Sequence, residues 1–166
     1  MGTLSTQFKQ QLDREISLLL KQSGISNSKS YETKRLTYED FLSNRLLIIK
    51  IIRNGIPYSF FSLIQYMAPF SENDWAIILD LSTKSLQRYK KSSRSFRPLQ
   101  SEKIIEIAEV TNIGLELFGE MNKFKLWLDT PNFALGNHKP IELLRDSYGK
   151  EMVIGELTRI NHGIFV

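Results

Sequence analysis

The polar residues of segment 83–91 have the types and spacing needed to contact nucleic-acid bases. Lys84, Ser85, Gln87, Arg88 and Lys91 take outward positions if this segment is a helix whose inner side carries Leu86. Arginine can bridge O6 and N7 of guanine, and glutamine can pair with N6 and N7 of adenine, so both suit the DNA major groove. The segment therefore predicts a recognition helix.

Positive charge is concentrated around this helix. Residues 81–101 include six basic residues and no acidic one, whereas residues 104–166 include six basic and nine acidic residues. Lys90, Lys91, Arg94 and Arg97 are placed for phosphate contacts, each of which adds affinity by releasing counterions. A solvated helix face is the alternative explanation of the basic run. The uneven charge indicates two surfaces with different partners.

Helical periodicity runs along the chain, and no segment alternates apolar and polar residues as a half-buried strand would. We therefore expect an all-α fold, with proline, glycine and capping residues at the helix ends. The expected turn before the recognition helix contains Asp80 and Leu81. The expected helices cover residues 6–23, 38–53, 57–68, 75–79, 84–91, 99–117, 122–128 and 141–147, and a last helix follows Gly149 and stops at Gly163.

The composition leaves few routes to catalysis. The 166 residues include no cysteine, and the two histidines, His138 and His162, are 24 positions apart. No glycine-rich phosphate loop is present, so we expect no metal, no cofactor and no enzymatic activity. The apolar runs are too short to cross a membrane, and a cytoplasmic protein is expected. An enzyme that uses Asp, Glu or Tyr with one His remains the contrasting hypothesis.

The segment from Leu79 to Arg88 resembles the helix-turn-helix of Xre-type antitoxins. That motif commonly has the order Leu-Gly-apolar-Ser-x-x-Thr-Leu-x-Arg, and this chain has Leu79, Ser82, Leu86 and Arg88 in register with it. Asp80 stands where glycine is usual. Aspartate is among the few residues that tolerate the left-handed backbone conformation, so the turn remains feasible.

The C-terminal segment is similar to the toxin-binding domain of Xre/ParS-type antitoxins, which are partners of RES-domain toxins. The similarity is carried by Trp127-Leu128, by Asn132-x-Ala134-Leu135-Gly136, by the run from Pro140 to Leu144, and by the terminal Gly163. Together with the helix-turn-helix, the resemblance covers residues 57–166. It leaves the first 50 or so residues without an explanation.

The resemblance implies an antitoxin that represses its own operon through operator DNA and covers the active-site cleft of an NAD-consuming toxin. It implies a toxin-binding domain at 121–166, preceded by a DNA-binding and dimerisation domain at 38–120. For residues 1–37, the helical spacing at 6–23 and the polar composition of 25–37 predict a helix and a flexible linker. A homodimer is expected, as for most helix-turn-helix proteins. The toxin-facing residues would lie within Trp127, Asn132, Leu135, Lys139, Pro140, His162, Gly163, Ile164, Phe165 and Val166.

Two choices stay open at the level of sequence. Trp127 is either a core anchor or a toxin contact, and the apolar tail 164–166 either packs on its own core or enters a cleft on a partner. The main alternative function is a plain helix-turn-helix transcription regulator whose C-terminal helices serve dimerisation. A neighbouring gene that encodes a RES-like enzyme would favour the antitoxin.

Overall fold

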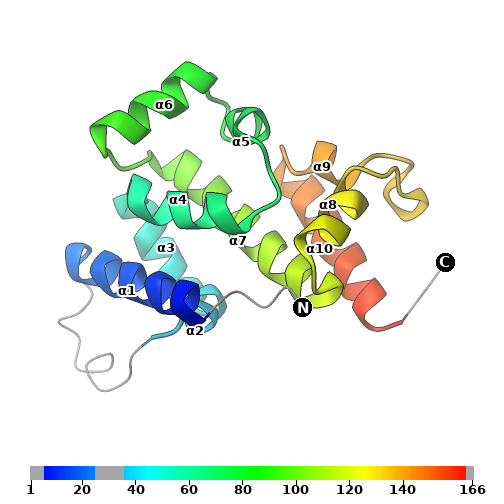
Figure 1. The fold of residues 1–166 in the computed structure, drawn as a ribbon, viewed down its shortest axis with the longest axis horizontal. Coiled ribbons are helices and arrows are strands. Elements are labelled where there is room, and N and C mark those ends of the chain that lie inside the picture. The colour runs from blue at the N-terminus through cyan, green and yellow to red at the C-terminus, as the bar shows by residue number, and fades with distance from the viewer. Residues whose placement is uncertain (1–5, 25–35, 164–166) are drawn as a thin grey trace. The chain divides into compact units, whose positions relative to one another are not determined.

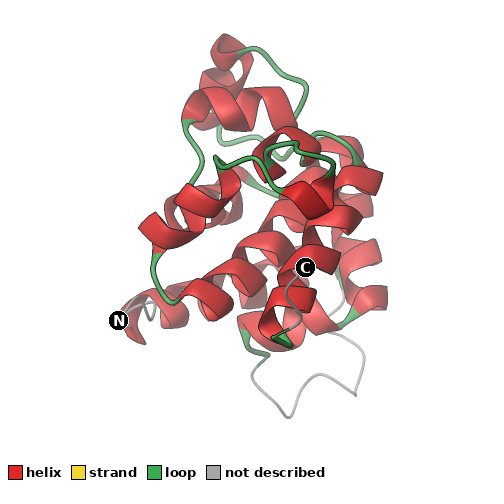
Figure 2. Cartoon of the chain, turned by 90° about the vertical axis from the view of Figure 1, so that its right-hand side faces the viewer, coloured by secondary structure: helices red, strands yellow, loops and turns green. Residues whose placement is uncertain are grey.

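The computed structural model describes residues 6–24 and 36–163, and within these ranges the chain forms helices and no strand (Figure 1, Figure 2). The all-α fold expected from the sequence is confirmed. The elements are α1 (Thr6–Gln22), α2 (Tyr38–Ser43), α3 (Arg45–Asn54), α4 (Tyr58–Met67), α5 (Glu72–Ile78), α6 (Thr83–Ser92), α7 (Pro98–Phe118), α8 (Met121–Leu128), the short 3-10 helix η2 (Phe133–Leu135), α9 (Pro140–Leu143) and α10 (Ser147–Asn161).

The helices pack into two compact units that are each built from separate stretches of sequence. Among the described residues, the N-terminal unit contains 6–24, 36–64 and 84–105, and the C-terminal unit contains 65–83 and 106–163. Each unit therefore takes part of α7. These units differ from the sequence-contiguous division at residues 37 and 120, which remains a prediction about function.

The N-terminal unit is held together by a few buried contacts between distant segments. The backbone N–H of Tyr38 donates to the Asp13 carboxylate at 3.0 Å, which fixes the start of α2 to α1. Further along, the buried Ser101 hydroxyl accepts the N–H of Ile56 at 2.9 Å, and the Phe96 N–H donates to the Ile56 carbonyl at 2.8 Å. These bonds tie the entry of α4 to the segment that leads into α7.

Close helix packing in the C-terminal unit depends on two glycines. A Cβ at Gly114 of α7 would collide with the ring of Phe124 on α8, and one at Gly149 of α10 would collide with the carbonyl of Leu143. The ion pairs of Lys150 with Glu109 at 3.5 Å and Glu106 at 4.0 Å join α10 to α7.

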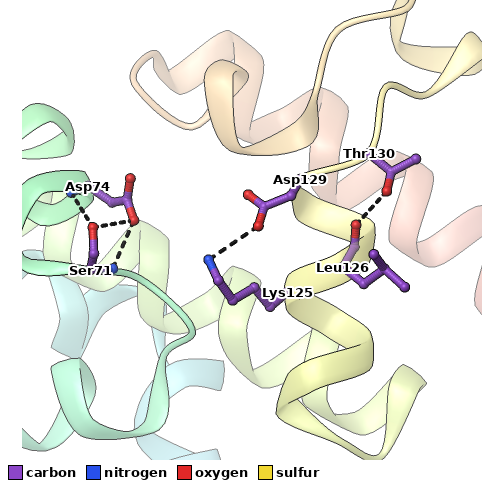
Figure 3. Close-up of polar contacts among 6 residues, drawn as sticks. All are labelled: Ser71, Asp74, Lys125, Leu126, Asp129 and Thr130. Carbon is purple, nitrogen blue, oxygen red and sulfur yellow. Dashed lines mark hydrogen bonds and ion pairs between the residues drawn. The ribbon is translucent and has the colours of Figure 1, made fainter.

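The helix ends follow the capping chemistry expected from the sequence in the region of the predicted motif. Ser71 caps α5 through a capping box, in which the Asp74 N–H donates to the Ser71 hydroxyl and the Ser71 N–H donates to the Asp74 carboxylate (Figure 3). After α5, Asp80 has a φ of 52°, and its N–H donates to the Ile77 carbonyl at 3.2 Å. The left-handed turn expected at Asp80 is confirmed.

Three expected helix bounds were wrong. The expected helix 38–53 is divided at Asn44, whose backbone is extended and whose side-chain oxygen accepts the N–H of Leu47 to cap α3. Helix α9 ends at Leu143 rather than at residue 147. The last helix begins at Ser147 rather than after Gly149, because Gly149 serves close packing against Leu143 instead of breaking the helix.

The strain at Asp80 gives a first prediction. Replacing Asp80 with Gly removes the Cβ that disfavours the left-handed conformation, so we expect the free energy of unfolding to rise by about 0.5–1 kcal/mol. Chemical denaturation of the full chain measures this change in the free energy of unfolding. The same replacement at Asp146, where φ is −117°, should lower stability or leave it unchanged. Equal effects at the two positions would contradict the assigned strain.

Candidate functional site

An aromatic stack beneath α6 fixes the position of this helix in the N-terminal unit. The ring of Tyr89 stacks on Phe96 with 4.4 Å between centroids and 17° between planes. Phe96 in turn contacts Phe61 at 4.9 Å and Tyr58 at 6.3 Å. Leu86 of the same helix is fully buried. The inner side of α6 thus packs in the core, and these contacts restrict rotation of the helix about its axis.

The outer side of α6 carries the side chains predicted to bind DNA. Lys84, Gln87, Arg88 and Lys91 are exposed, and their spacing places them together on one side of the helix. Ser85 is half-buried, and its hydroxyl accepts a hydrogen bond from the Arg88 guanidinium at 3.0 Å. This bond holds Arg88 close to the helix.

Three further predicted phosphate contacts are also exposed. Lys90 lies on α6 away from the side that carries Arg88, and Arg94 and Arg97 lie in the segment between α6 and α7. We call the eight residues the α6 surface: Lys84, Ser85, Gln87, Arg88, Lys90, Lys91, Arg94 and Arg97. The structure places all of them in the N-terminal unit, without an acidic residue between Leu81 and Ser101 to offset their charge.

A second aromatic cluster lies in the C-terminal unit, where α8 packs on α7. Phe124 is fully buried and stacks on Phe118 at 5.9 Å, while Trp127 contacts Phe118 at 5.8 Å and Phe124 at 6.3 Å. At the end of α8, Lys125 pairs with Asp129 at 3.2 Å and the Thr130 hydroxyl donates to the Leu126 carbonyl at 2.6 Å (Figure 3). Both contacts fix the direction in which the chain leaves α8.

Asn132 organises the turn that follows. Its backbone N–H donates to the His138 carbonyl at 3.1 Å, and its side-chain oxygen accepts the Ala134 N–H at 2.8 Å. Its backbone carbonyl accepts the N–H groups of Leu135 and Asn137. Asn137 and Gly136 both have positive φ, as a tight turn of this kind requires. The asparagine of the sequence pattern therefore holds a compact connection between α8 and α9.

A buried carboxylate connects this turn to α10. Glu156 is 6% exposed and accepts two hydrogen bonds from Arg159, at 2.8 and 2.7 Å, and one from the Asn132 amide at 3.4 Å. The hydrogen bonds from Arg159 lower the pKa of Glu156 below its ordinary value, against the opposing effect of burial. The hydrogen bonds that Arg159 donates to Glu156 in turn raise the pKa of Arg159 above its ordinary value. The ion pair thus stays charged at neutral pH.

The comparisons with known proteins reveal similarities to one family of antitoxins. Residues 114–163, from the last turn of α7 to just beyond the end of α10, match the model of the antitoxin Xre/MbcA/ParS C-terminal toxin-binding domain. The chain is 26% identical over 124 residues to Antitoxin Xre of Yersinia enterocolitica, which covers 74% of this chain and 84% of the relative. Residues 114–163 are thus similar to the toxin-binding domain of the Xre/MbcA/ParS antitoxins, and both curated relatives are named Antitoxin Xre. These similarities support an antitoxin of a toxin–antitoxin system with a toxin-binding C-terminal domain, a class of proteins that are not enzymes.

Two further similarities concern sequence and fold. The chain is 27% identical over 115 residues to Antitoxin Xre of Photorhabdus laumondii, with 69% of this chain and 78% of the relative covered. Its fold is similar to that of a chain in the crystal structure of the M. tuberculosis MbcT-MbcA toxin-antitoxin complex. The TM-score is 0.54 at 24% identity, and 64% of this chain and 94% of that chain are covered.

The residues predicted to face the toxin have different positions in the antitoxin. Lys139, His162 and Gly163 are exposed, whereas Leu135 and Pro140 are buried and Asn132 and Trp127 are half-buried. Trp127 belongs to the aromatic cluster on α7, as expected of a core anchor. The predicted contacts Ile164, Phe165 and Val166 lie outside the described residues. The buried Leu135 and Pro140 are therefore not accessible for direct contact in this structure.

The structure also brings out apolar residues that the sequence interpretation did not include. Leu126, Phe133, Tyr148 and Met152 belong to the matched region and have exposed side chains. Sequence reasoning passed over them because an apolar residue within a helix is usually assigned to the core. The signal that could have found Tyr148 and Met152 is their spacing of four residues, out of phase with Gly149 and Val153.

The antitoxin lacks two other kinds of site within the part of the chain that the structure describes. Residues 6–24 and 36–163 contain no group of three His, Cys, Asp or Glu residues that could hold a metal ion. No helix in these ranges is long and apolar enough to cross a membrane.

The buried ion pair makes stability depend on pH in a defined direction. Because the pKa of Glu156 in the folded antitoxin lies below its ordinary value of 4.5, its contribution is present above that pH and is lost as the pH falls through the lowered value. Replacing Glu156 with Gln should lower the free energy of unfolding at pH 7 by about 1–3 kcal/mol. The difference in the free energy of unfolding between wild type and Glu156→Gln should narrow as the pH falls below 4.5 and through the lowered pKa of Glu156, because the wild-type carboxylate then becomes protonated. Denaturation curves of wild type and Glu156→Gln, recorded from pH 7 to pH 3, measure this difference in the free energy of unfolding.

The exposed Glu151 on the same helix provides the matched control. Replacing Glu151 with Gln should change stability by less than about 0.5 kcal/mol at either pH. A loss for Glu156→Gln that stays constant over the whole pH range would show that packing, and not the charged hydrogen bonds, accounts for the effect.

Proposed function

We propose that the antitoxin neutralises an NAD-consuming RES-domain toxin and represses its own operon. The C-terminal domain would cover the active site of the toxin, and the α6 surface would bind operator DNA. The observation that carries the proposal is the presence of two separate surfaces in one chain. One is a basic, exposed helix with an immobilised inner side, and the other belongs to the matched toxin-binding domain.

For DNA, the types of side chain on the α6 surface support a division of roles. Lys84, Ser85, Gln87 and Arg88 lie in the first part of the helix, where a recognition helix contacts base edges. Lys90, Lys91, Arg94 and Arg97 follow and would contact phosphates. Because Tyr89 and Leu86 fix the inner side of α6, the side chains proposed to contact bases keep a fixed direction.

We further propose that the antitoxin binds its operator as a homodimer. A twofold dimer would place two copies of α6 about one turn of DNA apart, about 34–36 Å, in successive major grooves. The operator would then contain two related half-sites. Both partners, operator DNA and an NAD-consuming toxin, would be met in the cytoplasm, so the antitoxin is expected to act there.

For the toxin, the exposed members of the matched region are the proposed contacts. Lys139, His162 and Gly163 are accessible, and the tail 164–166 that follows Gly163 is proposed to enter the active-site cleft. Leu135 and Pro140 would act by supporting this surface from the core. The antitoxin contributes no catalytic group on this proposal, and NAD is bound and consumed by the toxin.

A substitution in α6 tests DNA binding separately from toxin binding. Replacing Arg88 with Ala should weaken binding to the operator fragment about tenfold or more, because one base contact is worth about 1–3 kcal/mol. Inhibition of the toxin should not change. Arg53, exposed at the end of α3, serves as the matched control, and its replacement with Ala should leave operator affinity within about twofold. Unchanged operator affinity in Arg88→Ala would contradict the groove assignment.

A growth experiment tests the toxin. The gene adjacent to that of the antitoxin is induced with and without the antitoxin, and cellular NAD is measured together with growth. We expect induction alone to deplete NAD and stop growth, and co-expression to restore both. If the adjacent product is harmless and NAD does not change, a plain helix-turn-helix regulator becomes the better explanation.

A further inference from the structure

Helix α10 has an outward side with exposed apolar residues in the described part of the chain. Tyr148 is 85% exposed and Met152 is 49% exposed, and the exposed Gly155 follows them. The spacings of four and three residues place these residues in one line along the helix. We call Tyr148, Met152 and Gly155 the α10 strip. It is an apolar line on a helix whose neighbouring exposed residues, such as Glu151 and Thr158, are polar.

Gly155 is the unusual member of the strip. Of the glycines inside the described helices, Gly114 and Gly149 are each explained by an atom of this chain that a Cβ would strike. A Cβ at Gly155 would meet nothing within 4 Å, and the backbone there does not have the positive φ that favours glycine. Nothing within the described antitoxin requires glycine at this position.

A glycine inside a helix lowers the stability of the helix relative to alanine, because it has more conformational freedom to lose on folding. Such a residue often serves close approach of another molecule, since the missing side chain lets a ring or backbone come directly against the helix. Next to Gly155, Met152 offers a flexible apolar side chain, and Tyr148 offers a large ring of the kind that dominates binding energy at interfaces.

The opposite side of α10 is held firmly in the C-terminal unit. Val153 and Leu157 are fully buried, Gly149 lies directly against Leu143, and Lys150 pairs with Glu109 at 3.5 Å. The strip is therefore presented on a helix that cannot easily turn or shift. A surface that is already ordered before binding loses less conformational entropy when a partner arrives.

We propose that the α10 strip is a contact surface for the toxin, with Tyr148 and Met152 as apolar anchors and Gly155 as the point of closest approach. This inference rests on the proposed function, and it names residues that the predicted toxin-facing set does not contain. The toxin is the occupant because α10 lies wholly within the matched toxin-binding domain, residues 114–163. The strip also leads along the helix towards His162 and Gly163, which are proposed toxin contacts. The facing surface of the toxin must be apolar and must reach the helix backbone at Gly155.

The experiment uses the full antitoxin and a catalytically inactive form of the RES-domain protein encoded by the adjacent gene. Affinity is measured by titration calorimetry, and thermal stability is measured for each antitoxin variant alone. Tyr148→Ala and Met152→Ala should each weaken binding about tenfold or more. The matched control is Tyr66→Ala, which removes another tyrosine, 74% exposed, from outside the matched domain and should change affinity less than about twofold.

Gly155→Ala gives the sharpest test because its two effects have opposite signs. The added methyl group should raise the melting temperature by about 1–4 °C, since alanine favours the helix. It should nevertheless weaken toxin binding about tenfold or more, because it separates the two surfaces. A stabilised variant that binds less well cannot be explained by misfolding.

Three outcomes would overturn the inference. If wild type binds the toxin and the strip variants bind within twofold of it, the α10 strip is not a contact and the proposed function stands. If the variants alter self-association of the antitoxin, measured by light scattering, and not toxin affinity, a second copy occupies the strip. If wild-type antitoxin does not bind the toxin, the proposed function itself fails, and the inference fails with it.

Discussion

The C-terminal domain depends above all on how α10 is fixed to its neighbours. Lys150 lies between Glu106 and Glu109 of α7, and Gly149 allows the helix to approach the carbonyl of Leu143. These ion pairs are largely buried, so removal of one partner would leave an uncompensated charge in the interior. The registration of α10 determines where Glu156 meets Asn132, and therefore how the turn between α8 and α9 is held. It also determines which residues of α10 face outward.

The same physical arrangement occurs in the N-terminal unit with different chemistry. There, α6 is fixed by an aromatic stack rather than by ion pairs, and its outward residues are basic rather than apolar. In each unit one side of a helix packs in the core. This packing fixes which residues of the helix face outward. Such an arrangement suits recognition, because contacts that are ordered before binding lose less conformational entropy when a partner arrives.

Sequence patterns predicted most of the fold because its helices carry strong local signals. Proline, glycine and capping residues stand at helix ends as expected: Pro98 begins α7, Ser71 caps α5 and Gly163 follows α10. Asp80 has the left-handed conformation expected of the turn. The failures occurred where tertiary contacts override local preference. Gly149 has the composition of a helix stop, but its role is set by Leu143, a neighbour that periodicity does not reveal. Likewise the exposure of Tyr148 follows from which side of α10 packs inward, and an apolar residue alone does not disclose that side.

The central claim is that one chain carries two binding surfaces, one on α6 and one in the C-terminal domain. Amide hydrogen exchange on the full antitoxin, measured alone, with the inactive toxin and with operator DNA, tests this claim most directly. We expect the toxin to slow exchange within residues 121–161 and to leave residues 83–92 unchanged, and DNA to do the reverse. Protection of residues 83–92 by the toxin, with no change in residues 121–161, would contradict the assignment of the two surfaces.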